Sequence, residues 1–348
     1  MTYQEILNNA KDCLGPYCKG CPVCNGKACK NQMPGPGAKG VGDTAIRNYD
    51  KWLDIRVNMD TLCPNGEPDT SLELFGRKFK YPIFAGPVGA VNLHYGDKYN
   101  DMEYNNILVP ACAKAGIAAF TGDGTNPQVM VAATAAIKNN DGFGIPTVKP
   151  WNKETVDEKL KLIDESGAFA VAMDIDAAGL PFLKNLDPPA GRKSVSELAE
   201  IIDSFKKKGI PFIVKGVMTV KGALKAKEAG AAAIIVSNHG GRVLDQCPAT
   251  AEVLTEIADA VKKATAEWEE PMKVLVDGGI RSGVEVFKAL AMGADAVLVA
   301  RPYVTAVYGG AEEGVISYTE KLGEELKDTM SMCGATRLDE ISRDMVRL

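Results

Sequence analysis

Short apolar runs alternate with helical, polar-faced stretches along most of this chain. From about residue 81 onward, each run ends in or beside Gly, Ser, Asp or Lys and precedes a segment with helical periodicity. Eight runs follow this pattern: 82–86, 117–121, 142–147, 169–174, 211–215, 232–237, 273–277 and 295–300. Helical segments such as 153–165, 195–208 and 250–263 lie between them. Continuous apolar strands joined by helices are typical of a parallel sheet buried on both faces.

Eight such units predict an α/β fold, a closed TIM (β/α)8 barrel. A doubly wound open sheet is the alternative, but its Gly-x-Gly-x-x-Gly turn after the first strand is absent. We predict a cysteine-rich metal-binding or cluster-binding extension over residues 1–32 and a barrel, with its covering segment, over residues 33–348. A helix is expected at 44–53 and a loop at 33–37, where proline and glycine alternate. Residues 179–193 have no helical periodicity and predict a long active-site loop or lid.

Composition and charge narrow the classes of function. The 348 residues include 45 acidic and 40 basic side chains, a formal net charge of −5. Because this balance offers no basic stripe to a polyanion, we expect no nucleic-acid partner. The first ten residues lack the layout of a secretory signal, and no apolar run is long enough to span a bilayer. We therefore expect a cytoplasmic protein with no membrane partner, acting on a small-molecule substrate.

The ends of the predicted strands carry the candidate chemistry, as they do in barrels of this kind. His239, one of only two histidines, follows the sixth run, with Arg242 three residues later. A lone histidine in a loop is more often structural, but this position favours a base beside a fixed cation for an anionic substrate. Residues 277–283 and Arg301 follow the seventh and eighth runs. Glycine N–H groups and arginines at these two ends suit a phosphate.

The chain from residue 212 onward resembles the FMN-dependent 2-hydroxy-acid oxidase and dehydrogenase family, above all at 214–217, 234–242, 277–283 and 300–302. Weaker similarity extends back to residue 33. The resemblance implies FMN, a substrate oxidised at a C–OH carbon, and a homo-oligomer, a tetramer in this family. It implies His239 as base, Asp176 as its partner, Arg242 as the substrate-carboxylate ligand and Lys215 at the flavin. The implied cofactor-binding residues are Pro87, Val88, Gly89, Thr121, Asp174, Lys215, Ser237, Asp277, Gly278, Gly279, Arg281, Ala300 and Arg301.

The same resemblance shows departures around the substrate. The family adds a second arginine and two tyrosines at the substrate carboxylate, whereas Phe182, Thr147 and the region of Met33 and Pro34 align there. Asp174 stands where the family has a threonine beside the flavin. These differences predict that the flavin site is kept while the substrate site is rebuilt.

Cysteines concentrate near the start of the chain. Five of the nine are Cys13, Cys18, Cys21, Cys24 and Cys29. The C-x2-C-x2-C core of this cluster is typical of a [4Fe-4S] run, since zinc sites usually join two distant Cys pairs. Structural zinc is the alternative, and a disulfide is less favoured in a reducing compartment. The fourth cluster ligand stays open among Cys13, Cys29 and Cys63.

We therefore expect an FMN-dependent oxidoreductase acting on a 2-hydroxy-acid-like substrate, with His239 as base. Electrons would leave through the iron–sulfur cluster to a ferredoxin-like electron acceptor. One alternative keeps the flavin chemistry but acts on an amine or on a bulkier or cyclic alcohol. Another is non-redox: a flavin-dependent isomerase, or a flavin-binding regulatory protein with a structural zinc.

Overall fold

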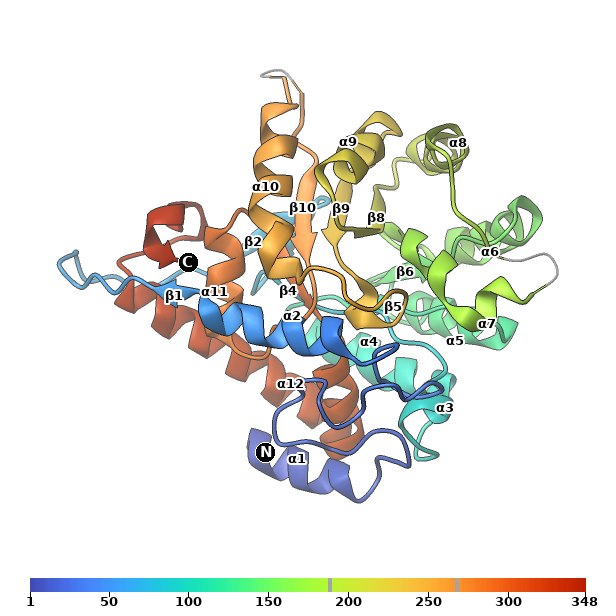
Figure 1. Ribbon diagram of the computed structural model, residues 1–348, viewed down its shortest axis with the longest axis horizontal. Coiled ribbons are helices and arrows are strands. Elements are labelled where there is room, and N and C mark those ends of the chain that lie inside the picture. Colours follow the sequence, from blue (N-terminus) through green and yellow to red (C-terminus); the bar gives the residue numbers. More distant parts are fainter. Residues whose placement is uncertain (187–189, 267–268) are drawn as a thin grey trace.

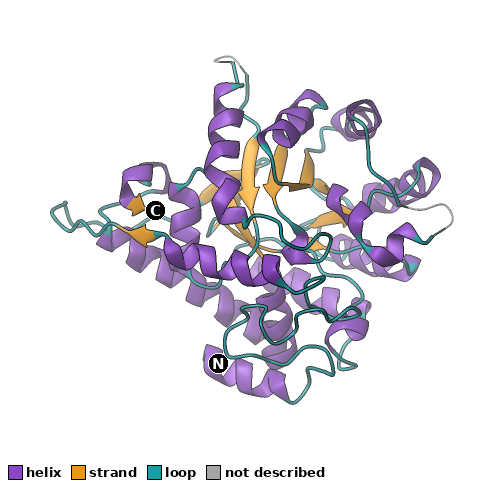
Figure 2. Cartoon of the chain, in the orientation of Figure 1, coloured by secondary structure: helices purple, strands orange, loops and turns teal. Residues whose placement is uncertain are grey.

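The computed structural model describes residues 1–186, 190–266 and 269–348. Its centre is an eight-stranded parallel sheet in the order β4-β11-β10-β9-β8-β7-β6-β5 (Figures 1 and 2). The backbone of Ala85 on β4 pairs with Ala119, and its N–H donates to the carbonyl of Ala118 at 3.1 Å. This contact joins the two edges, so the sheet is closed. The predicted TIM barrel is confirmed, and the open-sheet alternative is wrong.

Every predicted apolar run overlaps one barrel strand. The strands are β4 (Ile83–Ala85), β5 (Phe120–Thr121), β6 (Ile145–Val148), β7 (Val171–Asp174), β8 (Phe212–Val217), β9 (Ala233–Val236), β10 (Lys273–Val276) and β11 (Ala296–Val299). Inside the barrel, side chains such as Phe84, Phe120, Ile213 and Leu275 form a buried cluster. Alternate strand residues face outward and pack against the helices, so both faces of the sheet are apolar.

Helices surround the sheet, as Figure 2 shows in purple around the orange strands. The helices between barrel strands are α3 (Val91–Tyr95), α4 (Asp101–Lys114), α5 (Pro127–Lys138), α6 (Lys153–Ser166), α7 (Pro181–Lys184), α8 (Val195–Lys206), α9 (Val220–Glu228), α10 (Thr250–Lys263) and α11 (Gly283–Ala291). The helices expected at 153–165, 195–208 and 250–263 are confirmed as α6, α8 and α10. The long α12 (Arg301–Met332) follows the last strand.

The remaining elements lie outside the barrel repeat. They are α1 (Tyr3–Lys11), α2 (Asp43–Asp54), the antiparallel pair β1 (Arg56–Val57) with β12 (Val346–Arg347), and the hairpin β2 (Leu72–Leu74) with β3 (Arg77–Phe79). The helix expected at 44–53 is confirmed as α2, and residues 33–37 are a loop as expected.

Helix α1 was not expected from the sequence. Thr2 and Glu5 form a capping box at its start, and Ile6 and Ala10 are fully buried. The helix packs on α12, where the side-chain amide of Asn9 donates to the carbonyl of Gly309 at 3.1 Å. The start of the chain therefore contributes to the main core, beside the C-terminal helix (Figure 1).

The loop predicted at 179–193 follows a 3-10 turn (Ile175–Gly179). It contains the short α7, which the sequence did not predict, and residues 187–189 lie outside the described part.

Among the described helices, we find none with the length and apolar character needed to cross a bilayer.

Candidate active site

One cavity of about 650 Å³ opens at the carboxyl ends of the barrel strands. Residues at or after the ends of all eight barrel strands converge on it, as the position rule for these barrels requires. The predicted site residues that line it are Pro87, Val88, Gly89, Asp174, Lys215, His239, Arg242, Asp277, Gly278, Gly279, Arg281, Ala300 and Arg301. Thr121, Ser237 and Asp176 lie at strand ends behind this lining, and the five clustered cysteines are not part of it.

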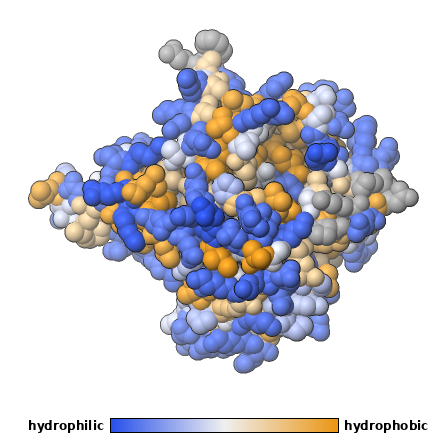
Figure 3. Space-filling view, viewed as in Figure 1, coloured by the Kyte–Doolittle hydropathy of each residue, from blue (hydrophilic) through white to orange (hydrophobic). Residues whose placement is uncertain are grey.

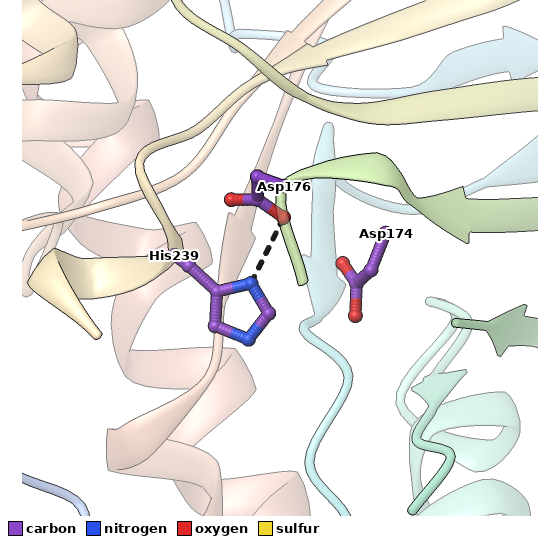
Figure 4. Close-up of side chains that lie close together, drawn as sticks. All are labelled: Asp174, Asp176 and His239. Atoms are coloured by element: carbon purple, nitrogen blue, oxygen red, sulfur yellow. Dashed lines mark hydrogen bonds and ion pairs between the residues drawn. The ribbon is translucent and has the colours of Figure 1, made fainter. Parts of the chain in front are cut away.

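His239 and Asp176 form the ion pair or hydrogen bond that the sequence predicted. Nδ1 of His239 lies 3.0 Å from Oδ1 of Asp176 (Figure 4). Because a carboxylate only accepts, Nδ1 carries the proton and Nε2 of a neutral imidazole is left as a base. The backbone N–H of His239 donates to the hydroxyl of Ser237 at 3.2 Å, which ties the loop to β9.

Buried charges fill the floor of the cavity. Nζ of Lys215 lies 2.9 Å from Asp174 and 3.6 Å from Asp277. Burial alone would lower the pKa of Lys215, but these two carboxylates outweigh it and hold the pKa above its ordinary value. Lys149, at the end of β6, lies 3.9 Å from the other oxygen of Asp174. Asp174 is therefore neutralised from two sides, and burial of its charge is outweighed so that its pKa stays low.

Residues fit for a flavin and its phosphate surround this floor. Within the described residues, Oγ1 of Thr121, Oγ1 of Thr147 and Oδ1 of Asp277 are buried without a hydrogen-bond partner. Such orphaned groups usually mark a missing ligand atom. The glycines at 278 and 279 expose backbone at one side of the cavity, with Arg281 and Arg301 beside them. This donor set suits FMN, a planar polar ring that ends in one phosphate.

The three arginines of the site contact backbone carbonyls of the N-terminal segment. Nε of Arg281 donates to Cys24 at 2.8 Å, and Nε of Arg301 donates to Pro36 at 3.0 Å. Nη1 of Arg242 donates to Gly35 and, at 3.3 Å, to Gly37. Burial lowers the pKa of Arg242 to about 10, so the guanidinium keeps its charge at neutral pH. Residues 24–37 therefore cover the positive end of the cavity.

Helix α2 fixes the two loops that carry the site. The side-chain amides of Asn48 and Asn238 exchange two hydrogen bonds, at 2.7 and 2.9 Å, in the loop that carries His239. Nε1 of Trp52 donates to the carbonyl of Gly278 at 2.7 Å in the loop after β10. A side chain at Gly279 would have its Cβ only 1.9 Å from the carbonyl of Asn48, so glycine is required at this close approach.

The cysteines form a looser group beside this cover. Burial raises the pKa of Cys18 to about 11, and the charges of Cys24, Cys29 and Cys21 raise it further. These four sulfurs therefore lie close enough to interact. The thiol of Cys13 instead contacts the carbonyl of Asn9 at 3.5 Å. Among the described residues, which include all nine cysteines, no three cysteine sulfurs lie within 4.8 Å of one another.

Sequence reasoning missed several polar or charged side chains of the cavity, including Lys149, His94, Asp123, Thr125 and Asn185. Lys149 was detectable by the rule that selected Lys215, because it follows directly on a strand whose predicted end fell one residue early. His94 lies on α3, and no sequence signal distinguished it. Phe182 lines the cavity as expected for the rebuilt substrate side, whereas Thr147 lies buried behind the cavity wall.

The surface around this region is mixed. The face in Figure 3 shows hydrophilic residues over α2 and apolar residues scattered around it. Leu93 and Phe182, which line the cavity, are exposed apolar side chains.

Comparison with known proteins places the chain in a family. The family model for FMN-dependent dehydrogenase matches residues 36–185 and 189–348, and the match begins just after the cysteine-rich segment. Glycolate oxidase 5 of Oryza sativa subsp. japonica is 44% identical over 350 aligned positions that cover 89% of each chain. The chain therefore belongs to the FMN-dependent dehydrogenase family, and FMN is the cofactor of that family. The predicted resemblance is confirmed.

Shorter matches and solved structures agree with this result. Two peroxisomal (S)-2-hydroxyacid oxidases of Arabidopsis thaliana are 46% identical over 138 residues, and these matches span 36% of the relatives' own length. A mandelate oxidase structure superposes with a TM-score of 0.75 at 24% identity and covers 99% of this chain and 97% of its own. A flavocytochrome b2 structure gives 0.75 at 23%, with 88% and 79% covered. At this identity the two structures show the fold alone.

Proposed function

We propose that this protein oxidises a 2-hydroxy acid to the 2-oxo acid with FMN as the electron acceptor and His239 as the base. The observation that carries the proposal is the His239–Asp176 pair, which opens into the same cavity as Arg242 and Lys215. The names of the relatives, which are glycolate and (S)-2-hydroxyacid oxidases, support the substrate class.

In the proposed reaction, Arg242 binds the substrate carboxylate and orients the carbon that bears the hydroxyl group. Nε2 of His239 removes the hydroxyl proton while Asp176 holds the imidazole through Nδ1. When bound, FMN takes up the two electrons and the hydrogen that the C–H bond loses. Lys215 would contact the ring edge, where its charge stabilises the added negative charge.

The phosphate of FMN would lie between Gly279, Arg281 and Arg301, with Asp277 and Thr121 contributing polar contacts to the rest of the flavin. Ser237, Gly278, Ala300 and the loop of Pro87, Val88 and Gly89 would complete the binding surface. These assignments rest on the convergence of the loops after β4, β10 and β11 on one cavity.

An anaerobic substrate screen tests the proposal. Flavin bleaching would be recorded with lactate, glycolate and mandelate, with amino acids, and with cyclic alcohols and amines. We expect bleaching with at least one 2-hydroxy acid. Bleaching by amines or cyclic alcohols alone would favour the alternative substrate class, which the replacement of the family's second arginine by Phe182 leaves open. A protein that binds FMN and is reduced by none of them would contradict the proposal.

We further propose that Cys18, Cys21, Cys24 and Cys29 hold a [4Fe-4S] cluster that passes electrons to a ferredoxin-like acceptor. The four thiols influence one another electrostatically and lie on the segment that contacts Arg281 and Arg301. The C-x2-C-x2-C spacing of Cys18, Cys21 and Cys24 is that of an iron–sulfur run, which favours the cluster over zinc.

Anaerobic iron and sulfide analysis tests the cluster. Cys21→Ser should lose most of the iron, whereas Cys13→Ser should keep it, and Cys247→Ser serves as a control outside the segment. Zinc in place of iron would contradict the cluster. A cluster that stays oxidised while the flavin is reduced would contradict its role in electron transfer.

We also propose that the protein is a cytoplasmic homo-oligomer, on the grounds of the chain's composition and family.

A further inference from the structure

His94 is a partly buried polar side chain that the proposed reaction does not use. It lies on α3, between the first barrel strand and α4, and lines the same cavity as His239 and Arg242. Its Nδ1 accepts a hydrogen bond from the backbone N–H of Gly35 at 2.9 Å. Because an acceptor nitrogen carries no proton, the ring proton of the neutral imidazole is on Nε2.

The environment keeps this imidazole uncharged. Burial, and then the positive charges of Arg242 and Lys149, lower the pKa of His94 to about 3. At neutral pH the side chain is therefore a fixed N–H donor without a charge. Among the described residues, no protein group forms a hydrogen bond with Nε2 of His94. This nitrogen is also not one of the fully buried polar atoms that lack a partner. Its donor is available to a molecule in the cavity.

Gly35 couples this donor to the carboxylate ligand of the site. Its N–H holds His94, and its carbonyl accepts from Arg242. The two side chains are consequently oriented by one residue and approach the same part of the cavity. The resemblance to the family leads us to expect a tyrosine hydroxyl near residues 33 and 34, where this chain has methionine and proline. A donor from α3 would fill that role.

We propose that His94 is a substrate-binding residue whose Nε2–H donates to the carboxylate that Arg242 binds. This inference rests on the proposed oxidation of a 2-hydroxy acid and specifies its substrate as the anion, in preference to an amine or a neutral alcohol. The carboxylate is then held by one charged and one neutral donor, in place of the two arginines and two tyrosines of the family.

Two variants separate this role from a purely structural one. His94→Asn keeps an acceptor near Nδ1 for the Gly35 N–H but has no donor at the Nε2 position. His94→Gln places an amide N–H near Nε2 and gives up the Gly35 contact. A substrate-binding role predicts that asparagine is the more damaging change, and a role in holding the loop predicts the reverse.

For lactate oxidation we expect His94→Asn to raise KM about 10- to 100-fold with little change in kcat, because a hydrogen bond to a charged acceptor is lost. His94→Gln should lie closer to the wild-type protein. Lactamide, which lacks the charge, should show a much smaller difference between variants. FMN content and thermal unfolding of both variants serve as controls for folding. Equal KM values for lactate in the wild-type protein and both variants would overturn the inference.

A binding measurement makes the test independent of turnover. The chain has only two histidines, so a 15N-histidine spectrum holds two imidazoles, and His239→Ala assigns them. Pyruvate should shift the Nε2 signal of His94 in the FMN-loaded protein and bind at least 10-fold more weakly to His94→Asn. If pyruvate binding depends on His94 but no 2-hydroxy acid is oxidised, the proposed function fails while this inference stands. Pyruvate that leaves the His94 signal unchanged would refute it.

Discussion

His239 lies in a backbone conformation that few side chains other than glycine adopt. Its φ is 56°, and Gly240 and Gly241 follow with φ of 62° and 79°. The two glycines adopt this conformation without steric cost, whereas His239 adopts it only where surrounding contacts enforce it. The Asn48–Asn238 amide pair on one side and the Asp176 bond on the other supply such contacts. The imidazole is therefore preorganised before any substrate arrives.

The first prediction concerns the base. Replacing His239 with alanine should slow flavin reduction by substrate by roughly 10²–10⁴, since general-base catalysis is lost. FMN content should stay normal, because the phosphate contacts lie elsewhere. Anaerobic stopped-flow absorbance measures the reduction rate, and the spectrum of the purified variant measures the flavin. Reduction at the wild-type rate would remove His239 from the mechanism.

The second prediction concerns acid stability. The pKa of His94 in the folded chain, about 3, lies below its unfolded value of 6.5, so the unfolded state takes up the proton first. Above pH 6.5 the imidazole is neutral in both states and the free energy of unfolding is unaffected. As the pH falls toward 3, protonation of the unfolded chain lowers the free energy of unfolding by roughly 3–5 kcal/mol at most. Urea titrations at pH 7, 5 and 4 should show a smaller loss for His94→Asn. An identical loss in both proteins would argue against a neutral buried imidazole.

At the scale of elements, α2 is the part of the chain that holds the site together from outside the barrel. It contacts the loop after β9 through Asn48 and the loop after β10 through Trp52. Both loops carry site residues, and neither has helical or strand structure of its own long enough to be rigid. A helix that precedes the barrel in the chain therefore links the loop of His239 to the loop of Gly278 and Gly279.

The third prediction tests this clamp. Trp52→Phe keeps the packing of a fully buried ring but removes the donor to Gly278. The free energy of unfolding should fall by about 1–2 kcal/mol, and FMN should dissociate more readily. Tyr81→Phe is the control, because it removes one hydrogen bond of a fully buried ring, from its hydroxyl to Glu320, and neither residue lines the cavity. A similar loss of stability with normal FMN affinity is expected there; weakened FMN binding in both variants would refute the clamp.

The sequence predicted the barrel elements well because buried parallel strands are continuous apolar runs. It missed α1, although Thr2 and Glu5 give the capping signal, because three apolar residues in a short polar stretch were too weak a pattern. It named Lys215, His239 and Asp176 from strand ends and from the resemblance. His94 and the contacts of residues 24–37 could not be predicted, because they depend on segments that meet across 59 residues in one case and 257 in another.

At the scale of the molecule, the N-terminal segment is built into the catalytic end of the barrel. Helix α1 packs on α12, and the following residues cross to the cavity, where carbonyls of Cys24 and Pro36 hold Arg281 and Arg301. Arg281, which belongs to the proposed phosphate site, thus also contacts the cysteine-rich segment. One arginine faces two proposed cofactor sites.

The fourth prediction uses that shared arginine. Arg281→Ala should lower the FMN content and the iron content of the purified protein together, since it removes a phosphate ligand and the Cys24 contact. Arg47→Ala is the control. Arg47 lies on α2 and forms an ion pair with Glu252 of α10, and this variant should retain both FMN and iron. Absorbance and iron analysis on the same sample measure the effect. Loss of FMN with full iron would separate the two sites.

A shared arginine also makes the loading of the two cofactors reciprocal. If the proposed cluster raises the affinity for FMN by some factor, FMN raises the affinity for the cluster by the same factor. The reason is that either order of binding leads to the same protein with both cofactors bound. The consequence is practical. A preparation that loses iron in air should also shed flavin, and supplying FMN during purification should protect the iron.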